Sequence, residues 1–167
     1  NRDSQGEVLT DAIDLRNRLE ELAESRPEQA NQYIRPIVLF QAQPRGKENS
    51  TTFEKLRDKL VEIGIPAEQI AIRTADVNEL KNQNLLSPEC PVRYIITVNA
   101  LKEGWDCPFA YILASLANKT SQVDVEQILG RILRLPHTTQ HSQHALNLSY
   151  VLTSSNDFDE TVKQIVK

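Results

Sequence analysis

Two apolar runs in the second half of the chain constrain its fold most, because neither alternates between apolar and polar residues. The runs are VRYIITV at residues 92–98 and FAYILASLA at residues 109–117. A strand that is half exposed to water alternates, whereas a strand that is covered on both faces is continuously apolar. The two runs therefore predict strands of a sheet that carries helices on both sides.

Other strand and helix patterns alternate along the chain. Further strands are expected at residues 35–41, 69–74 and 145–152. Residues 10–24 have apolar residues at helical spacing, and the run Ser25-Arg26-Pro27 is expected to end that helix. The alternation predicts an α/β layer fold with a mainly parallel sheet flanked by helices. We expect residues 1–30 to be a helical linker or appendage and residues 31–167 to form the domain.

Start and stop signals predict the remaining helices. Thr51-x-x-Glu54 resembles a capping box, and Gly64 followed by Pro66 is expected to end the helix that it starts. Asp76-x-x-Glu79 predicts a short helix. Ser121-x-x-Asp124 predicts a helix that continues through residue 133. A final helix is expected at residues 158–166.

The helix expected at residues 121–133 has two different faces. At about 100° per residue, Gln127, Arg131 and Arg134 fall on one narrow stripe, and the apolar residues fall on the opposite side. An apolar face of this kind packs on a sheet, so the stripe is expected to point away from it. Gly130 costs about 1 kcal/mol relative to Ala in mid-helix, which suggests close approach of another backbone or a ligand. A lone pair of arginines would more simply be a solvated helix surface.

A second motif, EGWDCP at residues 103–108, follows the strand expected at residues 92–98. In parallel α/β sheets, ligands gather beyond the carboxyl ends of the strands. We therefore expect this motif to lie at the carboxyl edge of the sheet. Trp105 could stack on a ligand there, but a buried core position suits it at least as well.

Together the two motifs resemble the second, C-terminal RecA-like motor lobe of superfamily-two helicases and translocases. The likeness is to the helicase subunit of type III restriction enzymes and related DEAD/DEAH-box proteins. Gly104-x-Asp106 matches motif five of that family, and Gln127-x-x-Gly130-Arg131-x-x-Arg134 matches motif six. The resemblance implies that residues 31–167 form one three-layer, P-loop NTPase-type lobe.

The family's mechanism implies roles for these residues. ATP with Mg²⁺ would lie between two lobes and would be held mainly by the first lobe. Arg131 and Arg134 would be the catalytic arginine fingers, because a guanidinium neutralises the charge that develops during phosphoryl transfer. Gln127 would hydrogen-bond within the site, Asp106 would accept from the ribose or hold a finger, and Gly104 would allow close approach to the ligand.

The resemblance also implies a nucleic-acid track and partners. Residues 97–102 (TVNALK) would contact the nucleic-acid backbone through Thr97, Asn99 and Lys102. Asn99 and Lys102 depart from the commoner residues of the family. The expected partners are nucleic acid, with DNA favoured over RNA, the N-terminal motor lobe of the same parent chain, and a methyltransferase or specificity subunit. A cytoplasmic location and no membrane contact are expected.

Several features of such a motor are missing from the sequence. No phosphate-loop pattern occurs, since AQPRGKEN lacks the first glycine and follows Lys47 with Glu48. No Asp-Glu pair ends an expected buried strand. The formal net charge is −4, so no global basic field attracts nucleic acid. We therefore expect this chain alone not to hydrolyse ATP and to supply only half of an active site.

Other interpretations remain open at this stage. The chain could be an RNA helicase lobe, or a non-catalytic module of the same fold that binds nucleic acid or a partner. It could also be a generic small-molecule domain in which QILGRILR is only helix surface. His137, His141 and His144 lie close together, but no Cys or acidic residue accompanies them, so we expect a solvated loop and no metal site.

Overall fold

A computed structural model describes residues 4–42, 52–99, 107–116, 122–134, 143–153 and 163–166. Its main sheet has six strands in the order β2-β3-β1-β5-β7-β8. The strands are β1 (Ile37–Gln41), β2 (Ile70–Ile72), β3 (Tyr94–Thr97), β5 (Ala110–Ser115), β7 (Leu148–Thr153) and β8 (Lys163–Val166). The first five are parallel to their neighbours, and β8 runs antiparallel to β7. The predicted α/β class with a mainly parallel sheet is confirmed.

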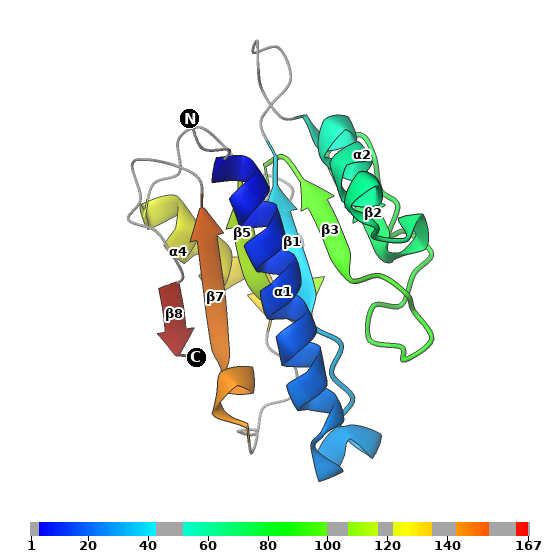
Figure 1. Ribbon diagram of the computed structural model, residues 1–167, viewed down its shortest axis with the longest axis vertical. Coiled ribbons are helices and arrows are strands. Elements are labelled where there is room, and N and C mark those ends of the chain that lie inside the picture. The colour runs from blue at the N-terminus through cyan, green and yellow to red at the C-terminus, as the bar shows by residue number, and fades with distance from the viewer. Residues whose placement is uncertain are drawn as a thin grey trace.

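Helices cover both sides of this sheet (Figure 1). The helices are α1 (Ser4–Glu24), α2 (Phe53–Ile63) and α4 (Gln122–Arg131), and the short 3₁₀ turns are η1 (Pro27–Ala30), η2 (Ala67–Gln69) and η3 (His144–Asn147). In the view of Figure 1, α1 and α2 lie in front of the sheet and α4 lies behind it. Among the helices that the structure describes, none combines the length and apolar character needed to cross a membrane.

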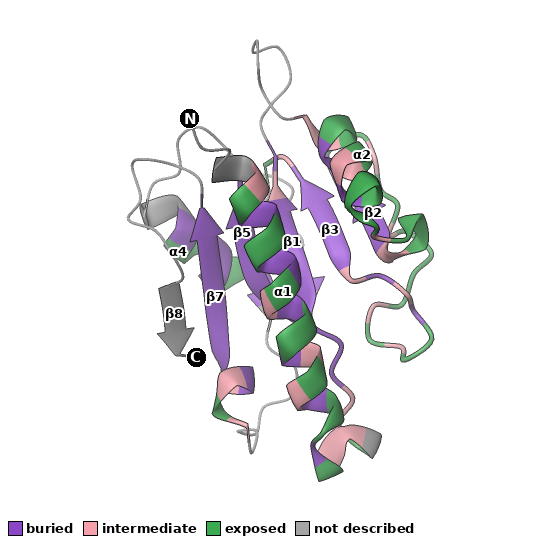
Figure 2. Ribbon diagram, in the orientation of Figure 1, coloured by how far each residue is buried: buried purple, intermediate pink, exposed green. Residues whose placement is uncertain are grey.

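The central strands form the core. Every residue of β2, β3, β5 and β7 is buried, and in β1 only Gln41 is partly exposed. Figure 2 shows these strands as a continuous buried layer. The absence of alternation in the sequence therefore has the predicted cause, which is that both faces of each strand are covered.

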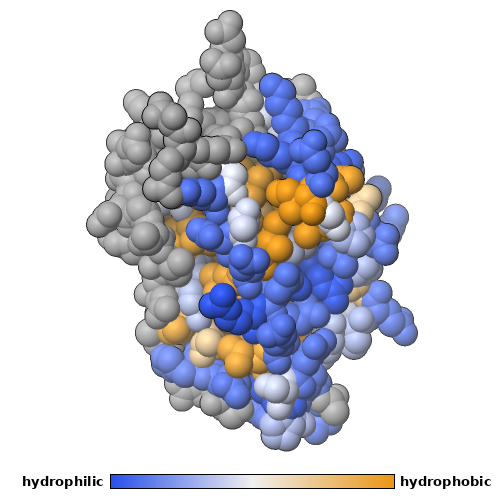
Figure 3. Space-filling model, in the orientation of Figure 1, coloured by the Kyte–Doolittle hydropathy of each residue, from blue (hydrophilic) through white to orange (hydrophobic). Residues whose placement is uncertain are grey.

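Helix α1 is packed on this sheet. Its buried residues share one hydrophobic core with the strands, and they include Leu9, Ala12, Leu19 and Ala23. Its outward face carries mainly charged, exposed residues and is hydrophilic in Figure 3. The helix thus covers one face of the sheet, while a domain boundary near residue 30 stays a prediction.

The start of α2 differs by one residue from the sequence pattern. Its N-cap is Thr52, whose hydroxyl accepts a hydrogen bond from the Lys55 amide at 3.4 Å, and Thr51 lies outside the described residues. The predicted stop at Gly64 is confirmed, because Gly64 adopts φ of 121° and its amide bonds back to the last turn. Glycine reaches such a φ without the steric cost that a side chain would add.

The prediction that Asp76-x-x-Glu79 starts a short helix is wrong. That segment forms turns with an isolated bridge between Arg73 and Asn78. The Thr74 hydroxyl accepts from the amide of Val77 at 3.1 Å, and the Glu79 carboxylate accepts from the amide of Ile72 at 2.9 Å. These side chains bond to the backbone outside any helix, which is how Thr competes with helix formation.

The final helix predicted at residues 158–166 is also wrong where the structure describes it. Residues 163–166 form strand β8, which pairs antiparallel with β7 from Val151↔Lys163 to Leu148↔Val166. The remainder of the predicted helix lies outside the described residues. The edge of β7 presents backbone N–H and C=O groups, and residues 163–166 pair with them as a strand.

Candidate functional site

Helix α4 has the two faces that the sequence predicts. Val125, Ile128 and Leu129 are buried, whereas Gln127 and Arg131 are exposed. The apolar side packs into the core, and the polar side leaves the Gln127 and Arg131 side chains accessible to a ligand. At Gly130 an added Cβ would meet nothing within 4 Å among the described residues, so none of them makes the close approach that was expected there.

The helix ends earlier than predicted, and this changes the position of Arg134. It ends at Arg131, and the chain then forms a second short strand, β6 (Leu133–Arg134). Arg134 therefore does not continue the helical stripe of Gln127 and Arg131. Its backbone is placed by β6, while its side chain lies outside the described set.

Strand β6 joins the two sequence motifs. It pairs in parallel with β4 (Cys107–Pro108), in the register Cys107↔Leu133 and Pro108↔Arg134. The Cys107 amide also donates to the Ile132 carbonyl at 2.7 Å. The end of EGWDCP and the end of QILGRILR thus lie side by side, although Ile132 comes 25 residues after Cys107 in the sequence.

This junction lies at the opposite edge of the sheet from the predicted one. Strand β4 is followed after one residue by Ala110, the first residue of β5, so β4 lies at the amino end of that strand. The prediction that EGWDCP lies at the carboxyl edge is therefore wrong for Cys107 and Pro108. Lys102, Gly104, Trp105 and Asp106 lie outside the described residues.

The carboxyl edge carries the other predicted residues. Thr97 is the last residue of β3 and is fully buried, whereas Asn99 is exposed. Of the two predicted nucleic-acid contacts that the structure describes, only Asn99 presents its side chain to solvent. Thr97 belongs to a row of polar residues that ends four adjacent strands.

The row runs across the sheet in register. Gln41 pairs with both Thr97 and Ser115, and Ser115 pairs with Thr153. The side-chain oxygen of Gln41 is buried and has no hydrogen-bond partner among the described residues. Gln41, Ser115 and Thr153 were not among the residues predicted from the sequence. The available signal was a polar residue at the end of each buried apolar run.

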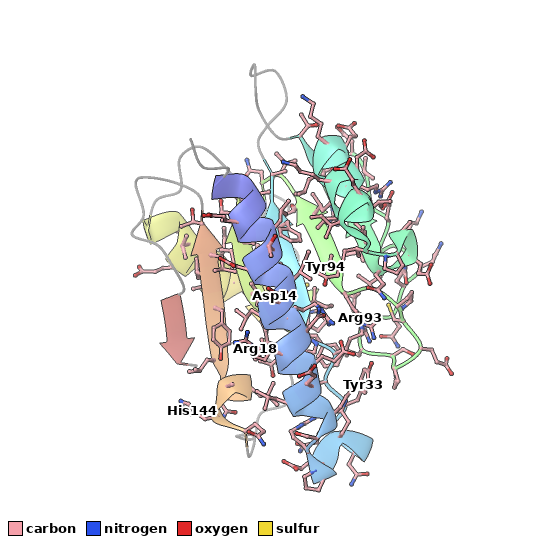
Figure 4. All side chains as sticks on the ribbon, viewed as in Figure 1. Asp14, Arg18, Tyr33, Arg93, Tyr94 and His144 are labelled. Carbon is pink, nitrogen blue, oxygen red and sulfur yellow. The ribbon has the colours of Figure 1, made fainter. Side chains whose placement is uncertain are left out.

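Arg16 and Arg93, near the amino edge of the sheet, form hydrogen bonds with other side chains of the chain. Arg93 and Arg16 both bind Glu20, and Tyr94 and Arg93 lie beside α1 in Figure 4. Burial alone raises the pKa of Glu20, but hydrogen bonds and charge from the two arginines outweigh it and lower that pKa. Burial raises the pKa of Tyr94, and Arg16 lies 5.6 Å from its ring centroid. These contacts tie α1 to the start of β3, although Arg16 Nε is buried and has no hydrogen-bond partner among the described residues.

The histidine cluster gives no metal site in the described part of the chain. His144 lies in η3 and is exposed, while His137 and His141 lie outside the described residues. Nowhere in the described ranges do three His, Cys, Asp or Glu side chains gather in a way that could hold a metal ion. Cys90 and Cys107 are both buried, and they form no disulfide bond with each other.

Comparison with known proteins adds no relative. No protein-family model matches the chain, and no curated protein or solved structure matches it either.

Proposed function

We propose that this chain is the C-terminal RecA-like lobe of an ATP-dependent DNA helicase or translocase of the type III restriction enzyme kind. The observation that carries the proposal is the parallel pairing of β4 with β6. This pairing brings the segment after Asp106 against the segment after Arg131. In a two-lobe motor these are the segments that would face one nucleotide.

Arg131 is suited to act across a gap between lobes. It is exposed in the last turn of α4, beyond the apolar face that packs on the sheet. Phosphoryl transfer builds negative charge on the oxygens of the γ-phosphate, and a guanidinium donates to two of them in a fixed geometry. Arg134 would join Arg131 from the adjacent strand β6, with Gln127 one helical turn before Arg131. Gly104 and Asp106 would complete this side of the ATP site.

The nucleic-acid track would lie at the other end of the lobe. Thr97 ends β3 and is buried, Asn99 follows it at the carboxyl edge with an exposed side chain, and Lys102 comes three residues after Asn99. Asn99 lies at this edge, whereas Cys107 lies in β4 at the amino edge. One segment would thus connect the nucleic-acid contacts to the nucleotide contacts, which is what coupling of hydrolysis to movement requires.

The proposal implies partners beyond this chain. The first motor lobe would supply the phosphate loop and the Mg²⁺ ligands, so ATP with Mg²⁺ would bind between the lobes. DNA is the proposed track, a methyltransferase or specificity subunit is a proposed partner, and the cytoplasm is the proposed location.

The test uses the parent protein that carries this chain together with a first motor lobe. Arg131→Ala and Arg134→Ala should each lower DNA-stimulated ATP turnover by about 10³-fold or more, with DNA binding retained. Arg18→Ala, which removes an exposed arginine from α1, is the matched control and should keep full turnover. Turnover by both finger variants within about threefold of wild type would refute the assignment. That result would favour a non-catalytic module, and stimulation by RNA instead of DNA would favour an RNA helicase lobe.

A further inference from the structure

The Arg35 side chain is buried next to two aromatic rings, with no carboxylate among the described residues paired to it. Arg35 is only 1% exposed. A charged group that is removed from water must be compensated by hydrogen bonds or by other favourable contacts. The groups that contact Arg35 therefore show which segments of the chain this buried charge holds together.

The guanidinium of Arg35 binds three backbone carbonyls of the segment that leads into β3. Nε donates to Val92 at 2.8 Å, Nη1 donates to Ser87 at 2.9 Å, and Nη2 donates to Leu85 at 2.6 Å. Three donors with a fixed planar geometry hold this segment against the start of β1. The carbonyl oxygens are satisfied at the same time.

The same guanidinium lies over two rings. Its central carbon is 5.8 Å from the Tyr33 ring centroid and 5.6 Å from the Phe109 ring centroid. The two rings meet edge to face, with centroids 5.9 Å apart and an interplanar angle of 79°. Such contacts favour one ring orientation, since the cation prefers the ring face and the ring edge prefers the neighbouring face. We call Arg35, Tyr33 and Phe109 the Arg35 cluster, and Tyr33 is labelled in Figure 4.

Phe109 is held in a strained backbone conformation. Its φ is 66°, and it is the one residue other than glycine with positive φ in the described ranges. Side chains disfavour this region, and such strain persists where the surroundings determine the conformation. The Phe109 carbonyl accepts from the Ile37 amide at 2.9 Å, and the pairing of β1 with β5 is irregular at Ile37.

The position of Phe109 gives this strain a consequence. It is the single residue between β4 and β5, so its φ sets the direction in which Cys107 and Pro108 leave the sheet. Those two residues pair with Leu133 and Arg134. We propose that the Arg35 cluster positions β4, and through it the arginine-bearing strand β6, from a place where it touches neither ATP nor nucleic acid. The catalytic half of this inference rests on the proposed function.

The structural half can be tested on this chain alone. Tyr33→Leu and Phe109→Leu keep an apolar side chain of somewhat smaller volume but remove the flat ring. The amide of Cys107 should then exchange its hydrogen about 10-fold faster than in wild type, because its bond to Ile132 loosens. Tyr33→Phe keeps the ring and loses only the long hydrogen bond, 3.5 Å, that the Tyr33 hydroxyl accepts from Arg35 Nη1, so it should show wild-type exchange. Leu60→Ala, in the buried face of α2, is the control that lowers stability without touching β4 or β6.

The catalytic half needs the parent protein with its first lobe. Misplacing a catalytic group by about 1 Å can cost about 100-fold in rate. Tyr33→Leu and Phe109→Leu should therefore lower kcat for ATP by about 10- to 100-fold, with DNA affinity unchanged. Tyr33→Phe should again behave as wild type, and Leu60→Ala should keep kcat at a temperature where both proteins are folded.

Each result decides one part. Faster exchange at Cys107 than in Leu60→Ala, together with the loss of kcat, supports the inference. Exchange no faster than in Leu60→Ala overturns it, whatever the ATPase shows. A third outcome is faster exchange at Cys107 with unchanged kcat, in a parent protein that Arg131→Ala inactivates. That outcome overturns the role of the Arg35 cluster in positioning the arginines for catalysis. If Arg131→Ala itself has no effect, the proposed function fails, and the exchange experiment still decides whether the cluster holds β4.

Discussion

Replacing Glu20 by Gln should destabilise the fold, because Glu20 links α1 to the start of β3. Its carboxylate accepts from Arg93 Nε at 3.1 Å and Nη2 at 3.3 Å, and from Arg16 Nη1 at 2.6 Å. The side chains of Glu20, Arg93 and Arg16 are 17%, 24% and 5% exposed, so water screens this group only in part.

The size of the effect follows from these contacts. A glutamine at this position would keep one acceptor oxygen but would turn an NH₂ group toward an arginine that can only donate. Arg16 would retain its bond to the Pro36 carbonyl and its contact with the Tyr94 ring, which limits the loss. Hydrogen bonds to charged groups contribute about 1.5–3 kcal/mol, and a half-buried pair that loses one partner costs less than a fully buried one. We expect Glu20→Gln to lower the free energy of unfolding by about 2–3 kcal/mol at pH 7.

The pH dependence gives the sharper test. The pKa of Glu20 is lowered in the folded state, so its contribution is fully present above the pKa of an unfolded Glu, about 4.3. It is lost as the pH falls through the lowered folded pKa. The difference between wild type and Glu20→Gln should therefore be constant from about pH 5 to 8 and should shrink below about pH 4.

Urea unfolding of both proteins at several pH values measures this difference. Glu21→Gln is the matched control, because Glu21 is the exposed neighbour on the same helix and should change stability by less than about 0.5 kcal/mol. Equal stability losses in the two variants at pH 7 would refute the reasoning. So would a difference that grows as the solution is acidified.

Three further predictions concern the backbone at two glycines, the absence of ATP turnover by this chain alone, and its binding to single-stranded DNA. Gly64→Ala should lower the melting temperature, at a cost of about 1–2 kcal/mol, because φ is 121° there even though an added Cβ meets nothing. Gly130→Ala should raise the melting temperature, by about 0.5–1 kcal/mol of stability, because Ala loses less backbone entropy than Gly in a helix. The purified chain should show no magnesium-dependent ATP turnover in a coupled assay, and measurable turnover that depends on Arg131 would contradict the half-site. The chain alone should bind single-stranded DNA weakly, with affinity falling steeply between about 50 and 200 mM salt, and tight binding at physiological salt in a fluorescence titration would contradict it.

Local sequence patterns determined much of this protein. The apolar runs at residues 92–98 and 109–117 predicted buried parallel strands because a strand covered on both faces has no polar side to show. The 3.6-residue period predicted which side of α4 is buried, and Gly64 followed by Pro66 predicted the end of α2. In each case the physical cause acts over a few neighbouring residues.

Only the tertiary structure decided the rest. Helix α4 ends at Arg131 because β6 finds its hydrogen-bond partner in β4, and residues 163–166 form a strand because β7 offers an edge. The place of Cys107 at the amino edge and the burial of Arg35 between Tyr33 and Phe109 likewise depend on segments far apart in sequence. Backbone pairing and the burial of a charge are settled by whichever partner the fold brings near, and no local pattern specifies that partner.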